Sequence, residues 1–222
     1  MGFEGVDVEA HPERLQDLKR LGVPRVPATI TGDRSVHGWN PSALAELVGV
    51  RYESAKRLTP EELTHRLDRV LAAAQRAVGQ VPAGGLEMKG PGRDRTLRRL
   101  GYHIFRLSLA FRDGHEQRIF PESWLLDNPP GSIRDAEDLV RYGDEVRAQL
   151  GEYFRRPGWS EGTVKTYYGP QSAHDLLERT TWHAAQHLRQ VYWFLERQGV
   201  TPDAPLADTD YAGLPIPRDV WS

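Results

Sequence analysis

Two histidines on one predicted helix carry the clearest chemistry in the sequence. His183 and His187 are four residues apart within the run Trp182–Arg189. A helix advances about 100° per residue, so the two rings project from nearly the same side, with Cβ atoms roughly 5–6 Å apart. Leu176 and Phe194 fall on that side too, which places the pair on the apolar face of the helix. Both rings could therefore reach one metal ion inside the protein.

The pair has a simpler explanation, in which each histidine is a core residue satisfied by its own hydrogen bond. That arrangement needs a separate acceptor for each neutral ring. A third ligand would favour the metal, and His103 on another predicted helix is the candidate. It falls about 60° from Leu100, at the edge of that helix's apolar face. If the two helices face each other, His103 completes a three-histidine site.

Composition limits the functions that the chain can have. It has 222 residues with 39% hydrophobic and 27% charged residues, a net charge of −2 and no cysteine. The charge balance gives no sign of nucleic acid or membrane binding, so we expect a small-molecule substrate, with a homodimer left open. No stretch approaches the roughly 18 apolar residues of a membrane span, so a cytoplasmic location is expected. Without cysteine, a metal site must use His, Asp or Glu, and no thiol nucleophile or disulfide can form.

Residues 1–50 predict short alternating elements in the order βαββα. The predicted strands and helices are Gly5–Val8, Pro12–Leu21, Val26–Ile30, Ser35–His37 and Pro41–Val48.

This segment resembles the C-terminal part of a glutaredoxin or thioredoxin fold, through Val26–Ile30 and the turns Gly32–Arg34 and Gly38–Pro41. The resemblance implies a cis peptide at Pro27. The family's first strand, cysteine motif and first helix have no counterpart here, so its redox chemistry cannot be carried over. We interpret residues 1–50 as a truncated module whose outer parts pair directly, borrow a strand or stay partly structured.

Residues 51–58 are expected to form a linker, and residues 59–200 contain four amphipathic patterns at helical spacing. With long first and third connections, they predict a mainly α fold, an antiparallel four-helix bundle. The proline-rich tail 201–222 is expected to pack on the surface through apolar side chains. The predicted helices run from 59 to 79, 94 to 111, 134 to 154 and 172 to 198, and the tail contacts come from Tyr211, Leu214, Ile216 and Trp221.

The placement of three histidines on the second and fourth of these helices resembles the pattern of the DinB-like (DinB and YfiT) superfamily, whose members are metal-binding four-helix bundles. In that family one histidine of the second helix and a His-x-x-x-His pair of the fourth hold a metal, which here implies His103, His183 and His187. Its members include transferases that use low-molecular-weight thiols such as mycothiol or bacillithiol, and many without a known activity. The resemblance therefore implies a metal site and leaves the reaction open.

Three neutral imidazoles leave a coordination position open, as catalytic rather than structural sites do. Zinc fits best, with nickel or iron as alternatives, and a thiol or water at the open position would lose its proton near neutral pH. Ala184 stands where a zinc protease of the His-Glu-x-x-His type has its glutamate, which argues against peptide hydrolysis. We therefore favour a metal-dependent thiol transferase or hydrolase. The alternative is a non-catalytic metal-stabilised bundle that serves as an interaction or stress-response module.

Flanking polar residues complete the predicted site. Arg179, Gln186 and Gln190 lie near the histidines on the helical wheel, where they could orient them or bind a substrate carboxylate. The basic stretch before the second helix could hold the carboxylates of an anionic thiol cofactor. Its residues are Lys89, Arg93 and Arg95. The simpler explanation is a solvated residue on the flank of the helix in the first case and a charged loop in the second.

Overall fold

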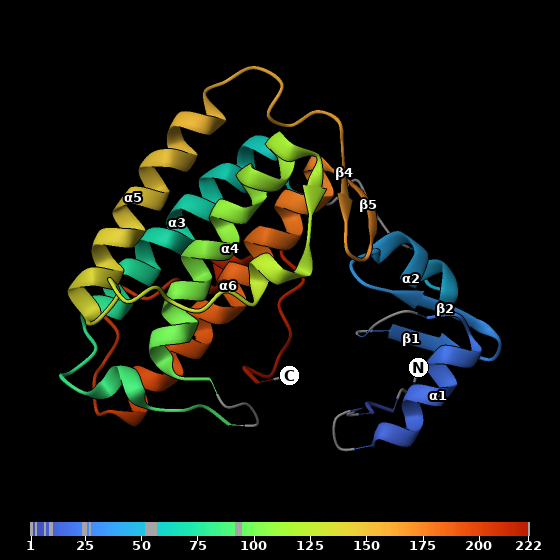
Figure 1. Ribbon diagram of the computed structural model, residues 1–222, viewed down its shortest axis with the longest axis horizontal. Helices are drawn as coiled ribbons and strands as arrows, with labels where there is room; N and C mark the ends of the chain where they lie inside the picture. Colours follow the sequence, from blue (N-terminus) through green and yellow to red (C-terminus); the bar gives the residue numbers. More distant parts are fainter. Residues whose placement is uncertain are drawn as a thin grey trace. The chain divides into compact units, whose positions relative to one another are not determined.

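The computed structural model describes residues 2, 4–6, 8, 11–23, 26, 28–51, 57–91 and 95–221. The chain forms two compact units, Met1–Ala55 and Lys56–Ser222. The described residues are mainly helical, with two small sheets (Figure 1).

The described residues of the first unit form a β-hairpin and three short helical segments. Asn40 caps α2 by accepting a hydrogen bond from the Ala43 amide, and Gly32, with φ of +64°, allows the turn between the strands. The strands pair antiparallel, with Ala28 opposite His37. The elements are η1 (Pro12–Arg14), α1 (Leu15–Arg20), β1 (Ala28–Thr31), β2 (Arg34–His37) and α2 (Pro41–Leu47).

The predicted strand at Gly5–Val8 is wrong for the residues that the structure describes there, Gly5, Val6 and Val8, none of which lies in a strand. Among the described residues of this unit, the sheet has two strands. A strand at these valines needs a neighbouring strand to pair with, and among the described residues β1 and β2 pair with each other. Pro27, with its implied cis peptide, lies outside the described residues.

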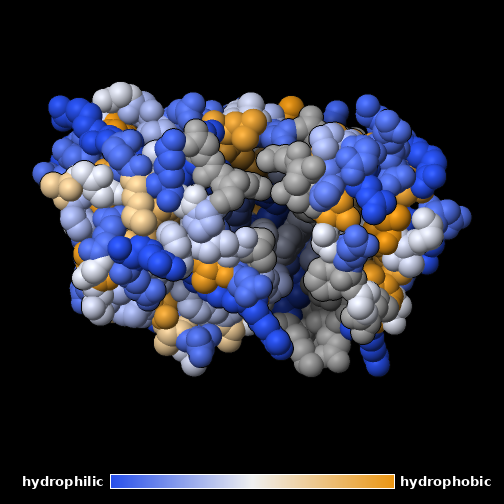
Figure 2. Space-filling model, turned by 90° about the horizontal axis from the view of Figure 1, so that it is seen from below, coloured by the Kyte–Doolittle hydropathy of each residue, from blue (hydrophilic) through white to orange (hydrophobic). Residues whose placement is uncertain are grey.

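Large apolar side chains are unevenly exposed. Figure 2 shows a face that is mostly hydrophilic, with separate hydrophobic patches. Most of the exposed large hydrophobic residues belong to the first unit. They are Val6, Leu15, Val26, Ile30, Leu44 and Val50, against Ile119 and Leu126 in the second unit. A two-stranded hairpin offers little surface on which such side chains could be buried.

Four long helices build the second unit. Each has a side chain at its N-cap that accepts a backbone hydrogen bond: Thr59, Thr96, Asp135 and Ser172. Helix α3 packs against α5 and α6, and α4 also packs against α5 and α6 (Figure 1). Their bounds are α3 (Pro60–Gly79), α4 (Leu97–Gln117), α5 (Ala136–Phe154) and α6 (Ala173–Arg197).

The core of the second unit lies between these helices. One connected cluster of buried side chains includes residues of all four, and its largest fully buried members are Phe105, Phe111, Phe120 and Phe194. Close approach depends on small residues, because a Cβ added at Gly143 of α5 would lie 2.6 Å from Cγ of Gln75 on α3. Burial of this apolar surface positions α4 against α6, and those two helices carry the three histidines.

The connections contain more structure than predicted. Helix α4 continues six residues past Phe111 to Gln117. A three-stranded sheet follows the order β3-β4-β5, with β3 parallel to β4 and β4 antiparallel to β5. Strands of two to four residues are too short to show a periodicity in the sequence. The added elements are η3 (Gly85–Glu87), β3 (Ile119–Phe120), η4 (Glu122–Leu125), β4 (Thr163–Thr166), β5 (Gly169–Ser172) and α7 (Asp208–Tyr211).

The C-terminal tail packs on the helices as predicted. Leu214 is part of the buried cluster, and Tyr211, Ile216 and Trp221 pack against it. The Trp221 ring lies edge-on to Trp193 and Phe194, with centroid distances of 5.2 and 5.8 Å. None of the described helices combines the length and the apolar character of a membrane span.

Candidate metal centre

Helices α4 and α6 bring three histidines together. His103 comes from α4, and His183 and His187 come from consecutive turns of α6. Candidate ligand nitrogens of the three rings all lie within 4.8 Å of one another. The ring centroids are 5.4 Å apart for His103 and His183, 5.0 Å for His103 and His187, and 4.6 Å for His183 and His187. A group of this shape could hold one metal ion.

Gln190 fixes the proton of His187. Nδ1 of His187 lies 2.7 Å from Oε1 of Gln190, and Nε2 of Gln190 donates to the carbonyl of Val220 at 3.0 Å. The Val220 carbonyl oxygen can only accept a hydrogen bond, so the side-chain NH2 of Gln190 must face it. This sets the orientation of the Gln190 amide and turns its oxygen toward His187. Its oxygen therefore accepts from Nδ1–H of His187, which leaves the lone pair of that ring on Nε2. This is the tautomer that a metal ligand needs.

His183 has an unsatisfied nitrogen. Among the residues that the structure describes, no group hydrogen-bonds to its buried Nδ1. A buried polar atom without a partner lowers the stability of the fold by about 1–3 kcal/mol. Binding of a metal ion by this ring would offset part of that cost. The simpler explanation, a core histidine with its own acceptor, does not describe this residue.

Burial keeps His103 and His183 uncharged. It lowers the pKa of His103 and of His183 well below 6.5, and the neighbouring His187 lowers both further. His103 is 4% exposed, and His183 and His187 are partly buried. Neutral imidazole is the form that binds a metal ion. The donor set and its protonation state fit a divalent transition metal.

Two other histidines of the same unit show the ordinary arrangement. The ring of His115 contacts the Tyr153 hydroxyl and, through Nε2, the carbonyl of Glu161 at 2.6 Å. Nε2 of His174 lies 2.9 Å from the carbonyl of Leu58. Among the described residues, the three clustered histidines are the group of His, Asp and Glu side chains whose geometry suits a metal.

The predicted flanking residues of α6 have different surroundings. Gln190 contacts His187, whereas Gln186 donates to the Val220 carbonyl at 2.8 Å and accepts from Arg189. Arg179 is buried one turn before His183. Gln190 is thus the one of the three predicted side chains with a hydrogen bond to a clustered histidine in the described part of the chain.

The predicted basic stretch is described only in part. Lys89 is exposed and pairs with Thr96 in an isolated β-bridge before α4. Arg95 lies near enough to His103 and His183 to lower the pKa of both, after burial and His187. Arg93 lies outside the described residues. Only Arg95 is thus placed toward the histidine cluster.

The role of the tail was not predictable from the sequence. Arg189 donates to the carbonyls of Pro217 and Arg218 at 2.6 and 2.9 Å, and Gln186 and Gln190 both donate to Val220. Three side chains of α6 therefore hold the last residues by backbone carbonyls. Every residue has a backbone carbonyl, so the identities of the tail residues do not indicate that α6 side chains bind them. The only signal was the set of polar residues flanking His187.

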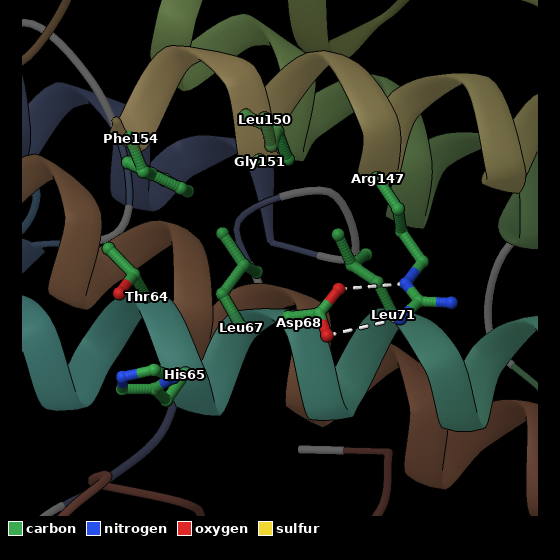
Figure 3. Close-up of a pocket in the computed structure, with 9 residues that line it drawn as sticks. All are labelled: Thr64, His65, Leu67, Asp68, Leu71, Arg147, Leu150, Gly151 and Phe154. Carbon is green, nitrogen blue, oxygen red and sulfur yellow. Dashed lines mark hydrogen bonds and ion pairs between the residues drawn. The ribbon is translucent and has the colours of Figure 1, made fainter. Parts of the chain in front are cut away.

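A separate groove lies between α3 and α5. Figure 3 shows its lining, with the Asp68 carboxylate paired with Arg147. Its volume is about 220 Å³, and its apolar wall includes Leu67, Leu150 and Phe154. None of the three histidines lines it.

No protein-family model matches the chain, and no curated protein matches it.

Proposed function

We propose that His103, His183 and His187 bind one divalent transition metal ion. The observation that carries this proposal is the convergence of three imidazoles within 4.8 Å. The buried Nδ1 of His183 and the fixed tautomer of His187 support it. Zinc is our first choice, and nickel and iron are the alternatives, because imidazole suits all three.

We also propose that the second unit is an antiparallel four-helix bundle of the DinB-like superfamily. The second and fourth long helices supply one histidine and a His-x-x-x-His pair, as in that family. The proposed organisation is a truncated thioredoxin-like segment at 1–50, a linker at 51–58, the bundle at 59–200 and the tail at 201–222. The helical content and the packing of α4 against α6 support it.

The activity that fits this site best is a metal-dependent transfer or hydrolysis reaction. A divalent ion with three imidazole ligands would lower the pKa of a small thiol or of water at its open position, producing a nucleophile near neutral pH. The protein contributes the protonation states: burial keeps His103 and His183 neutral, and Gln190 keeps the proton of His187 on Nδ1. The partner would be a small electrophile.

A non-catalytic metal site is the competing proposal. It is favoured by the tail, which three side chains of α6 tie down beside His187. A structural ion would be fully coordinated by protein, whereas a catalytic one would exchange its fourth ligand.

Cobalt(II) in place of zinc distinguishes the two. We expect the cobalt-loaded protein to show the visible absorption of a low-coordinate site, and 2-mercaptoethanol to add a sulfur-to-cobalt charge-transfer band. The His183→Ala variant should show neither. Visible absorption that thiol leaves unchanged would support the structural site and overturn the thiol-activating function.

A further inference from the structure

Arg179 is a buried cation without a carboxylate. It is 9% exposed and lies on α6, one turn before His183. Its guanidinium donates to the Tyr167 hydroxyl at 3.0 Å and lies 4.9 Å from the centre of the Tyr168 ring. No carboxylate pairs with it in the described part of the chain. A guanidinium has five N–H donors, and Arg179 uses one of them on a described protein group, the Tyr167 hydroxyl.

The acidic residues nearest in sequence are already engaged. Asp175 and Glu178, on the same helix, both accept from Arg57, at 2.8 Å for Asp175 and at 2.9 and 3.0 Å for Glu178. Arg57 thus takes both carboxylates and leaves Arg179 with the Tyr167 hydroxyl and the rings of Phe120, Tyr167 and Tyr168, whose centres lie 6.0, 5.9 and 4.9 Å from its guanidinium carbon. A buried charge is costly unless an opposite charge compensates it, and stacking on a ring returns only part of that cost.

The surroundings of the histidine cluster are electropositive. Beyond burial and His187, the charges that lower the pKa of both His103 and His183 come from Arg95 and Arg179. Positive charge of this kind attracts small molecules of the opposite sign.

We propose that Arg179 binds the carboxylate of a small molecule whose other end reaches the three-histidine cluster. Binding of the carboxylate to Arg179 does not depend on the proposed function. Only the contact between the other end of the molecule and the histidine cluster rests on it. A planar guanidinium pairs with a carboxylate through two parallel hydrogen bonds, for which Arg179 has the free donors. The carboxylate could belong to a thiol that binds the metal or to the molecule that the thiol attacks.

Isothermal titration of the full chain with matched ligands tests this. The probes are 3-mercaptopropionate and its neutral amide, 3-mercaptopropionamide, with the protein loaded with zinc. We expect wild type to bind the carboxylate about tenfold more tightly or better, because charge-assisted bonds of this kind are roughly twice as strong as neutral ones. In Arg179→Gln the two probes should bind within about twofold of each other. An unchanged preference in the variant, or no preference in wild type, overturns the proposal.

Arg197→Gln is the matched control. Arg197 also lies on α6 and stacks on an aromatic ring, 5.1 Å from the centre of Trp193, but it is exposed. The control removes the same charge and should keep the preference for the carboxylate. Arg179→Lys keeps the charge without the planar fork and should retain part of the preference, which provides a second variant if Arg179→Gln fails to fold. If Arg179 only holds the β4–β5 hairpin, Arg179→Gln will lower the melting temperature and leave the ratio of the two affinities unchanged.

The same titrations separate the two proposals. Propionate and propionamide carry no thiol, and their comparison on metal-free protein tests the Arg179 site without any metal. A preference for propionate in a protein that binds no zinc would sustain the Arg179 site and refute the metal centre. If propionate still binds when 3-mercaptopropionate saturates the metal-loaded protein, a second carboxylate site exists and the electrophile is the source. If 3-mercaptopropionate instead displaces propionate, the carboxylate bound at Arg179 is that of the thiol.

Discussion

Replacing Gln190 with leucine would remove the acceptor that holds the proton of His187 on Nδ1. That bond is 2.7 Å long, and its loss frees the ring to rotate and to take the other tautomer, which protonates the Nε2 proposed to face the ion. Loss of such an outer partner typically weakens metal binding by about 10- to 100-fold, or about 1.4–2.8 kcal/mol. We expect the zinc dissociation constant of Gln190→Leu to rise by this factor in competition with a chromophoric chelator.

Gln186→Leu is the matched control for that change. Gln186 is the same residue type one turn earlier, and it also donates to the Val220 carbonyl, but it is bonded to Arg189 rather than to a histidine. Its substitution should loosen the tail and change the zinc affinity by less than about threefold. Equal losses in Gln186→Leu and Gln190→Leu would refute the argument, because the effect would then arise from the tail and not from the tautomer of His187.

Two further predictions concern stability. Because burial lowers the pKa of His103 and His183 below 6.5, the unfolded chain binds more protons below that pH, so urea unfolding of the metal-free protein should show stability falling as the pH drops below 6.5. If the free energy of unfolding of a His103→Phe, His183→Phe double variant depended on pH as steeply as that of wild type, the two histidines would not be the cause. In the same assay Gly143→Ala should cost about 1–3 kcal/mol, because its Cβ would lie 2.6 Å from Gln75. Gly151→Ala on the same helix meets its nearest neighbour at 4.0 Å and should not destabilise.

The long elements could be predicted because their signals are local and repeated. The apolar positions of α3 recur at helical spacing, and Thr59 with Glu62 forms the capping box that the sequence indicated. Helix α6 begins after Ser172, as expected. Four helices with apolar faces must pack against one another, and this brings residues far apart in the sequence together.

The short elements and the contacts of the site could not be predicted in this way. Strand pairing between Phe120 and Thr166 depends on segments too short for a pattern, and the strand expected at Gly5–Val8 had a pattern without a partner. That His103 and His187 face each other could be expected from the order of the helices, because they lie on the second and fourth helices of the predicted bundle. The bond from Gln190 to Val220 depends on where a proline-rich tail settles, which neither periodicity nor propensity determines.

Elemental analysis of the purified protein tests the central claim most directly. The protein should be prepared without a metal-affinity tag and compared with His103→Ala, His187→Ala and, as a control, His65→Ala, which alters an exposed histidine of α3. We expect about one zinc, nickel or iron ion per chain in wild type and in His65→Ala, and a loss of that ion in the other two variants. Wild-type protein without a stoichiometric transition metal, or full metal content in His103→Ala, would contradict a three-histidine metal centre.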